Sequence, residues 1–520
     1  MSNEGNITDN EPAASPYAWY VLTVLVIVYM LNFIDRQILS ILAEDIKRDL
    51  KLSDGDLGFL FGTAFGVFYA LFGIPLGRLA DNWHRIRLIT TGLTLWSAMT
   101  ALSGFSMNLW QLSVARIGVG VGEASAAPSA YSILSDYFPK RQRATALAIY
   151  SSGLYLGGGL SLSIGGLVVG SWNHAFPNGG PLGLVGWQAA FMAVGIPGIL
   201  IALWVSTLRE PKRGAMDGVT SSISSSPFHD FGQELISIIP PLTLIGASRR
   251  GPRALIINLA VATVSGLVAF GMIRATGNIP QWVAVGIGAY AVFSWATALK
   301  VRDRPTYALI WGTPTFLYVA LSYGLIAFVS YGLALWAAPY AERELGQAKA
   351  VIGLFIGGGA ALSGFLGVNF GGWLADRLRR TNPSGRILVI MIGAAGPILP
   401  IIIAYTTSSA TLFYIMAFIY GVLGSSALGA AAATTQDLVL PRMRGTATAT
   451  FFIGTTLIGL ALGPYMAGFV STVTGSLRTG ILSLLIVTPI SLTVLFLAYR
   501  SLPKATASLI ERARAAGEVI

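Results

Sequence analysis

The chain has 520 residues, of which 54% are apolar and only 11% are charged, and its formal net charge at pH 7 is +11. Soluble domains carry about 25% charged residues, so this composition excludes an ordinary soluble protein and indicates a chain that crosses a membrane many times. The sequence has no cysteine, which excludes disulfides and thiolate metal sites. Because His84, His174 and His229 fall in predicted loops or linkers, we expect no metal site and no cofactor.

Windows of about 19 residues predict fourteen apolar spans, grouped as six, then two, then six. The first six lie near 18–42, 57–76, 86–105, 110–135, 144–170 and 186–208. The middle two lie near 254–273 and 282–299. The last six lie near 315–338, 350–374, 386–405, 409–434, 446–470 and 479–500.

Basic residues gather in the loops on one side of these spans, including 84–87, 140–143, 377–386 and 442–444. Cytoplasmic loops carry such an excess, so the even number of spans predicts that both termini are cytoplasmic. This asymmetry also explains the positive net charge, and we therefore expect no nucleic-acid partner.

The grouping of the spans predicts an all-α polytopic protein with two six-helix bundles and two extra helices inserted between them. Residues 209–253 form the main linker, which is rich in Ser and Pro. The predicted divisions are a cytoplasmic tail (1–17), a bundle (18–208), a linker with the two inserted helices (209–304), a second bundle (305–500) and a second tail (501–520).

Two short loop signals occur twice and in the same order, which indicates a duplicated bundle. Membrane proteins with internal repeats of this kind are most often transporters. The first signal is a Gly-x-Leu-Ala-Asp segment, and the second is an Asp seven residues before an Arg. The residues involved are Gly77 with Asp81, Gly372 with Asp376, Asp136 with Arg143, and Asp437 with Arg444.

Four charged residues fall inside predicted spans one and four: Asp35, Arg36, Arg116 and Glu123. An ionisable group at bilayer depth costs at least roughly 2.5–3.5 kcal/mol, so such groups normally face a partner or a cavity. At 1.5 Å per residue, Asp35 and Arg116 lie at a similar depth and could pair. Arg116 and Glu123 share one face of span four, and Arg36 could extend toward Glu123.

This set of charges supports two interpretations. It could be a structural network of ion pairs that fixes helix packing. It could instead be a proton and substrate site, in which protonation of Asp35 or Glu123 frees an arginine for an anionic group. The second half offers Tyr323, Tyr331, Trp336 and Tyr420 in place of charges, either as ordinary packing or as an aromatic wall that suits an amphiphile.

Span thirteen carries glycines followed by a Gly-Pro pair at Gly463 and Pro464. Glycine lets helices approach closely, and a Gly-Pro pair loosens a helix. The pair could therefore be a hinge between moving bundles, or it could serve static packing.

The loop signals resemble those of the major facilitator superfamily, over the whole chain outside the insert. In that family the Asp and Arg of this loop, here Asp81 with Arg85 and Asp376 with Arg377, latch the bundles together on the cytoplasmic side. Arg116 resembles the fourth-helix arginine that several members use in proton coupling. The chain departs from the family at Asn82, where a basic residue is usual, and at His84, where glycine is usual.

More narrowly, the Asn-Phe-Ile-Asp-Arg segment at 32–36 and the Gly-Glu-Ala segment at 122–124 resemble the spinster branch. This resemblance implies a transporter of lysolipids or sphingoid phosphates. The branch commonly has twelve helices, so the two inserted helices depart from it. The compact loops suggest a bacterial member in the inner (cell) membrane.

We therefore predict a proton-coupled secondary transporter that works by alternating access on an amphiphilic, lipid-like substrate. Asp35 and Glu123 would accept protons, and Asn32, Arg36 and Arg116 would provide the ion-pair and substrate contacts. Small organic anions or drugs are the alternative substrates. An integral-membrane enzyme or scaffold, or a channel, is the alternative class, but the chain lacks the histidine sets that such enzymes use. We expect a monomer whose other partners are protons and membrane lipids.

Overall fold

The computed structural model describes residues 14–214, 216 and 226–518. These residues form helices joined by short loops, and none of them forms a strand. Twelve helical stretches are long and apolar enough to cross a membrane. The all-helical membrane fold is thus confirmed, and twelve of the fourteen predicted spans meet these criteria. The other two predicted spans correspond to α4 (Arg85–Ser103) and to α5 (Leu109–Glu123) with α6 (Ala126–Tyr137).

The first half of the chain is a bundle built around α1 (Pro16–Leu50). Ser15 caps this helix by accepting a hydrogen bond from the Ala18 amide, and Pro16 supplies the fixed φ that suits a first helical position. The helix ends at Lys51, which adopts a left-handed conformation (φ 54°). The other helices of this half, besides α4 to α6, are α2 (Asp54–Gly58), η1 (Phe59–Thr63), α3 (Ala64–Asn82), α7 (Lys140–Ala175), η2 (Pro181–Gly183) and α8 (Gly186–Ser206).

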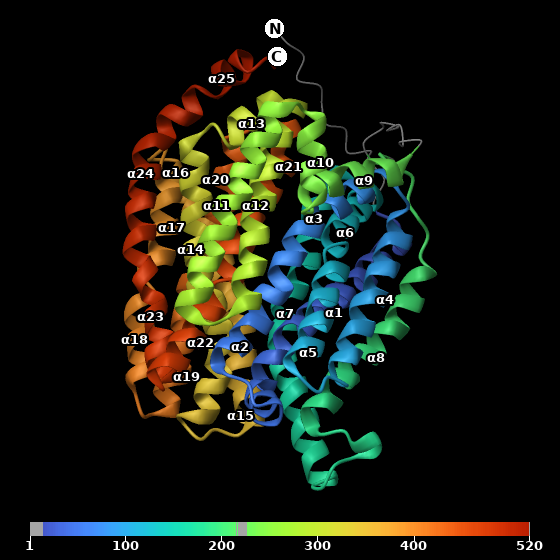
Figure 1. Ribbon diagram of the computed structural model, residues 1–520, viewed down its shortest axis with the longest axis vertical. Helices are drawn as coiled ribbons and strands as arrows, with labels where there is room; N and C mark the ends of the chain where they lie inside the picture. The colour runs from blue at the N-terminus through green and yellow to red at the C-terminus, as the bar shows by residue number, and fades with distance from the viewer. Residues whose placement is uncertain (1–13, 215, 217–225, 519–520) are drawn as a thin grey trace.

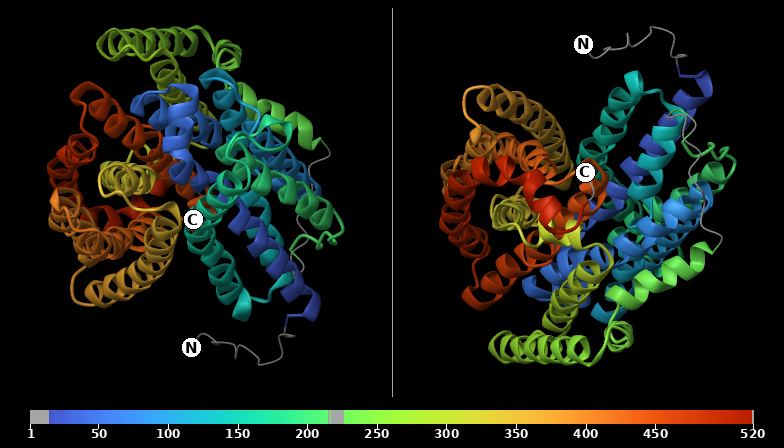
Figure 2. Two further views of the ribbon diagram at one scale, coloured as in Figure 1. Left: turned by 90° about the horizontal axis from the view of Figure 1, so that it is seen from below. Right: turned by 90° about the horizontal axis from the view of Figure 1, so that it is seen from above.

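The second half forms a similar bundle beside the first, as the two end-on views show (Figure 2). Its helices are more often interrupted by π-helical or 3₁₀ turns than those of the first half. They are α14 (Pro314–Arg343), α15 (Lys349–Ile352), η3 (Gly353–Gly357), α16 (Gly358–Arg379), α17 (Gly385–Ala395), α18 (Ile398–Thr406), α19 (Ala410–Ser425), α20 (Ala427–Asp437), η4 (Pro441–Met443), α21 (Arg444–Gly454), η5 (Thr455–Leu460), α22 (Gly463–Thr474), α23 (Leu477–Ser483), η6 (Leu484–Val487) and α24 (Thr488–Ala507).

The segment between the halves forms α9 (Pro227–Ile238), α10 (Leu242–Arg249), α11 (Pro252–Thr276), α12 (Ile279–Arg302) and α13 (Arg304–Ile310). The helices α9, α10 and α13 lie at the same end of the molecule as α25 (Leu509–Ala515), and we call this the terminal end (Figure 1). The opposite end, with α2 and α15, is the distal end. Helix α11 lies at the periphery, outside both bundles (Figure 2).

The two halves are tied together at the distal end by ion pairs. Arg343 of the second half lies 2.8 Å from Asp54 and 2.6 Å from Glu44 of the first. Lys349 lies 2.9 Å from Asp45. Positively and negatively charged side chains therefore close the distal end of the seam between the bundles.

Close backbone contact adds to this closure. A Cβ atom added at Gly62 of η1 would lie 2.3 Å from the carbonyl oxygen of Leu460 in η5. Only glycine permits this approach, since real Cβ atoms do not come within 3.0 Å of such an atom. The distal part of the seam is thus packed as tightly as a protein core.

Candidate functional site

The four predicted charged residues come together inside the first half, on α1 and α5. Asp35 and Arg116 have 0% of their surface exposed, and Glu123 has 1%. The guanidinium of Arg36 donates to Glu123 with a distance of 2.8 Å between Nη2 and Oε2. Asn32 is also buried and lies beside Glu123. The structure therefore contains the Arg36–Glu123 contact that side-chain reach predicts.

Arg36 is also surrounded by aromatic rings. Its guanidinium carbon lies 4.8 Å from the ring centre of Phe33, 4.5 Å from that of Phe65 and 4.9 Å from that of Tyr69. These rings attract a cation through their quadrupoles, so they add to the contacts that hold Arg36 in place. Sequence reasoning missed them, because aromatic residues are common in every span.

Arg116 and Asp35 meet in a different way from the predicted side-chain pair. Arg116 Nη1 donates to the backbone carbonyl of Asp35 at 3.2 Å, not to its carboxylate. Neither carboxylate oxygen of Asp35 accepts a hydrogen bond from a described residue. Trp96 and Thr100 lie beside this carboxylate without reaching hydrogen-bond geometry. Asp35 is therefore a buried acid whose charge is not satisfied by the protein around it.

A cavity of about 360 Å³ lies between the halves, with most of its wall in the second half. Tyr323, Tyr331 and Tyr420 line it, as the aromatic-wall interpretation expects, whereas Trp336 does not. The Trp336 indole instead donates to the carbonyl of Pro464 at 2.9 Å. The wall is therefore largely aromatic and apolar, with the hydroxyl groups of tyrosine, serine and threonine residues set into it.

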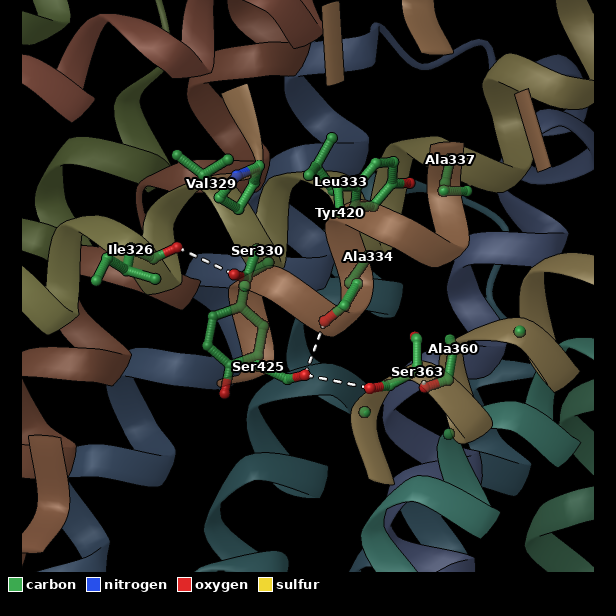
Figure 3. Close-up of a pocket in the computed structure, with 18 of the residues that line it drawn as sticks. Ile326, Val329, Ser330, Leu333, Ala334, Ala337, Ala360, Ser363, Tyr420 and Ser425 are labelled. Carbon is green, nitrogen blue, oxygen red and sulfur yellow. Dashed lines mark hydrogen bonds between the residues drawn. The ribbon is translucent and has the colours of Figure 1, made fainter. Parts of the chain in front are cut away.

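Small and polar residues complete the cavity, and no sequence pattern distinguishes them from the other residues of their helices. Ser330 and Ser425 turn their hydroxyls to carbonyls of their own helices, as Figure 3 shows for Ser330 and Ile326. The first half contributes residues of α1 and α7, among them Phe33, Gln37, Leu154, Tyr155, Gly158, Gly159 and Leu162. Phe33 lines the cavity, and its ring centre lies 4.8 Å from the guanidinium carbon of Arg36, so the ion pair and the cavity adjoin.

The predicted hinge lies at a break between two helices. The π-helical turn η5 ends at Leu460, and α22 begins at Gly463, with Pro464 at its second position. A Cβ atom at Gly463 would lie 2.1 Å from the carbonyl oxygen of Phe328 in α14. Gly463 is thus required for close packing, and its role in motion stays a prediction.

The predicted cytoplasmic-gate residues lie at the terminal end and make their ion pairs within each half. Arg85 pairs with Asp136 at 2.5 Å and with Glu210 at 2.7 Å. In the second half, Arg386 pairs with Asp437 at 2.6 Å and also with Asp376 at 3.1 Å. The sequence did not identify Glu210 or Arg386, because Glu210 lies 125 residues from Arg85 and Arg386 lies 51 residues from Asp437.

The remaining gate residues also contact their own half. Arg143 donates to the carbonyl of Ser135 at 2.8 Å, and Arg377 lies over the Trp373 ring at 5.6 Å. Asp81 lies near Arg78 and Arg213, and Arg444 begins α21. A Cβ at Gly77 would come no closer than 3.9 Å to Pro128, and one at Gly372 would meet no atom within 4 Å. In this conformation the described contacts of these residues do not latch the two halves together.

Comparison with known proteins identifies the family. The chain matches the model of the Major Facilitator Superfamily over residues 25–464 and again over 319–519. It is 27% identical to an MFS-type efflux pump of Mycolicibacterium smegmatis over 87% of this chain and 84% of the relative. It is 27% identical to human protein spinster homolog 1 over 87% of this chain and 72% of the relative.

A solved structure gives the same result. It is the inward-facing, unoccupied form of a bacterial homologue of the human lysosomal transporter spinster, and it aligns with a TM-score of 0.72 and 26% identity. The alignment covers 95% of this chain and 99% of the other. The chain therefore belongs to the Major Facilitator Superfamily of membrane transporters, and within it resembles the spinster proteins.

Proposed function

We propose that the protein is a proton-coupled secondary transporter that moves an amphiphilic, lipid-like substrate by alternating access. The observation that carries this proposal is a buried, incompletely satisfied set of charges directly beside a largely apolar cavity shared by the two halves. Closure at the distal end and the likeness to an inward-facing structure support a cycle in which the cavity opens to each side in turn.

Asp35 and Glu123 are the proton acceptors in this proposal. A buried carboxylate without donors costs less when it is neutral, so Asp35 gains from a proton whenever water reaches it. Protonation of Glu123 removes the charge that holds Arg36, and this frees the guanidinium for an anionic group of the substrate. Arg116 and Asn32 hold the two acids in place in both states.

The driving force is sufficient for this task. One charge that crosses about 100 mV supplies roughly 2.3 kcal/mol. At 1.4 kcal/mol per factor of ten, this supports a substrate gradient of about 50-fold.

The cavity favours a substrate with one apolar part. Its wall of Tyr323, Tyr331 and Tyr420 can surround an acyl or sphingoid chain, while Arg36 lies next to Phe33 at the first-half side, where an anionic head could reach it. The likeness to proteins named spinster supports a lysolipid or a sphingoid phosphate. The alternative is a small organic anion or drug, which the likeness to a protein named an efflux pump supports.

We further propose that α4 and the α5–α6 pair also cross the membrane, which gives fourteen crossings with α11 and α12 as the inserted pair. The basic loops then place both termini in the cytoplasm of a bacterium, with the protein in its inner membrane. In this orientation the terminal end faces the cytoplasm. We propose that the protein acts as a monomer.

The test is uptake into proteoliposomes driven by an imposed pH gradient, with a radiolabelled lysolipid in one series and hydrophilic organic anions or drugs in another. We expect Asp35→Asn and Glu123→Gln to abolish pH-driven uptake, because each removes one proton acceptor. Glu511→Gln, on the exposed surface of α25, is the matched control and should leave uptake unchanged. Unchanged uptake by both buried variants would reject the coupling role, and uptake of hydrophilic compounds alone would favour the alternative substrates.

A further inference from the structure

Helix α12 contacts both halves of the transporter at once. It lies along the seam between α3 of the first half and η5 of the second. A Cβ atom at Gly288 would lie 3.3 Å from Val67 of α3 and 3.2 Å from Leu457 of η5. An apolar cluster continues this contact along the seam, and its buried members are Val67, Leu71, Ile238, Ala284, Ala291, Trp295, Leu299, Ile453 and Ala461. The insert is therefore packed between the bundles and not only against one of them.

A polar contact crosses the same seam near the distal end. Thr63 of η1 and Gln281 of α12 both have 0% of their surface exposed. The Thr63 hydroxyl lies 2.5 Å from the carbonyl oxygen of Ala461 and 2.6 Å from Gln281 Oε1. The Gln281 amide also donates to the Ala461 carbonyl at 3.3 Å. One residue from each half and one from the insert thus share a single hydrogen-bonded group.

The Ala461 carbonyl of this group lies at the helix break that is the predicted hinge. Ala461 is in the two-residue break between η5 and α22, directly before the Gly463–Pro464 pair. Polar groups in a bilayer must find partners inside the protein, and buried side chains can supply them at an interrupted helix. Thr63 and Gln281 provide such partners at the break, and Thr63 contacts both Ala461 and Gln281 only while the two halves are close together here.

We propose that Gln281 is a positioning residue of the transport cycle: together with Thr63 it holds the distal seam closed at the helix break. This rests on the alternating access proposed above. Opening of the distal end must separate η1 from η5, which Gly62 keeps in backbone contact, so the three-residue group breaks in that step. The insert thereby shifts the conformational equilibrium toward the state that is closed at the distal end and open at the terminal end.

The absence of native cysteine makes a direct test possible, since two cysteines can be introduced without background labelling. Spin labels at Met107→Cys and Ser408→Cys would report the separation of the halves at the distal end, because both loops are exposed there. Pulsed electron paramagnetic resonance on the labelled full-length protein in nanodiscs gives the distance distribution, and hence the ratio of open to closed molecules.

We expect Thr63→Val and Gln281→Leu each to raise the ratio of open to closed molecules about threefold, which corresponds to the average of roughly 0.6 kcal/mol for a hydrogen bond between membrane helices. Thr63→Ser keeps the hydroxyl and should behave like the wild type. Thr263→Val makes the same change on the exposed surface of α11 and should also have no effect.

Two results would overturn the inference in distinguishable ways. If the wild type shows both distances but folded Thr63→Val and Gln281→Leu proteins keep its ratio, the positioning role is wrong while alternating access stands. If the wild type shows one fixed distance at every pH and with every substrate, alternating access itself is refuted, and the inference fails with it. Thermal melting of each variant shows whether it is folded.

Discussion

The ion pair between Arg36 and Glu123 allows the sharpest test of the site. The two groups are 2.8 Å apart, and their side chains are 7% and 0% exposed, so water screens the interaction little. Removal of one partner from a buried pair costs about 3–5 kcal/mol, because the other charge stays buried without compensation. In Glu123→Gln the Arg36 guanidinium stays buried without its partner. Three aromatic rings lie within 5 Å of it, and they offset ~0.5–2 kcal/mol of this cost in total.

We therefore expect Glu123→Gln to lower the free energy of unfolding by about 2 kcal/mol. Arg36→Met should cost less, because Glu123 can then accept a proton and become neutral. The double variant should recover most of the loss, since it leaves no unpaired charge. With an unfolding entropy of about 2.1 cal/mol/K per residue, 2 kcal/mol corresponds to a melting temperature about 2 °C lower in Glu123→Gln.

The assay is thermal unfolding in detergent followed by intrinsic fluorescence, for which the twelve tryptophans give a strong signal. If the double variant loses as much free energy of unfolding as the two single variants together, the reasoning is refuted, because additive losses mean that the two groups do not interact. Uptake measurements on the same proteins separate the two interpretations of the charges. A purely structural network predicts that Glu123→Gln loses stability but keeps pH-driven uptake.

Three further predictions concern the ends of the molecule. Gly62→Val should prevent distal closure and abolish uptake, because its side chain would overlap the Leu460 carbonyl; normal uptake would show that the contact is not needed. Arg343→Met removes the ion pairs that this arginine makes with Glu44 and Asp54, and it should shift the distal spin-label distances toward the open form. Unchanged distances would argue against a gate at these ion pairs. Burial raises the pKa of Asp303, but hydrogen bonds, mainly from Arg442, outweigh this and lower the pKa overall. The stability that Asp303 contributes is thus present above its unfolded pKa of about 3.9, and it is lost as the pH falls through the lower folded pKa. Arg442→Leu should therefore make the melting temperature depend less on pH between pH 6 and pH 3.

Hydropathy predicted most of the fold because a bilayer requires long apolar helices. The two spans that do not meet the criteria for length and hydropathy are those with the most polar content. One contains Arg116 and Glu123, and the other begins at Arg85 among several Ser and Thr residues. All of these side chains lower the mean hydropathy, but Arg85, Arg116, Glu123 and several of the Ser and Thr residues are buried, which a window along the sequence cannot detect.

The candidate site was predictable where the signal was a charge in an apolar segment. That the Arg36 side chain could reach toward Glu123 was predictable, and the two groups form an ion pair in the structure. The contact of Arg116 with a carbonyl of Asp35 was not predictable, since it depends on how two helix backbones approach. The cavity wall was missed for a different reason: residues such as Ser425 and Gly159 are ordinary for a membrane helix until packing places them around one space.

The first half holds Asp35, Arg36, Arg116 and Glu123, whereas the second half supplies most of the cavity wall. In the proposed mechanism, the proton-accepting groups and most of the wall that would contact the cargo are thus encoded in separate stretches of the gene. Exchange of one stretch between homologues should yield chimaeras that keep their proton dependence and acquire a new cargo. Such modular inheritance would let a lineage diversify what it carries without redesigning the step that drives it.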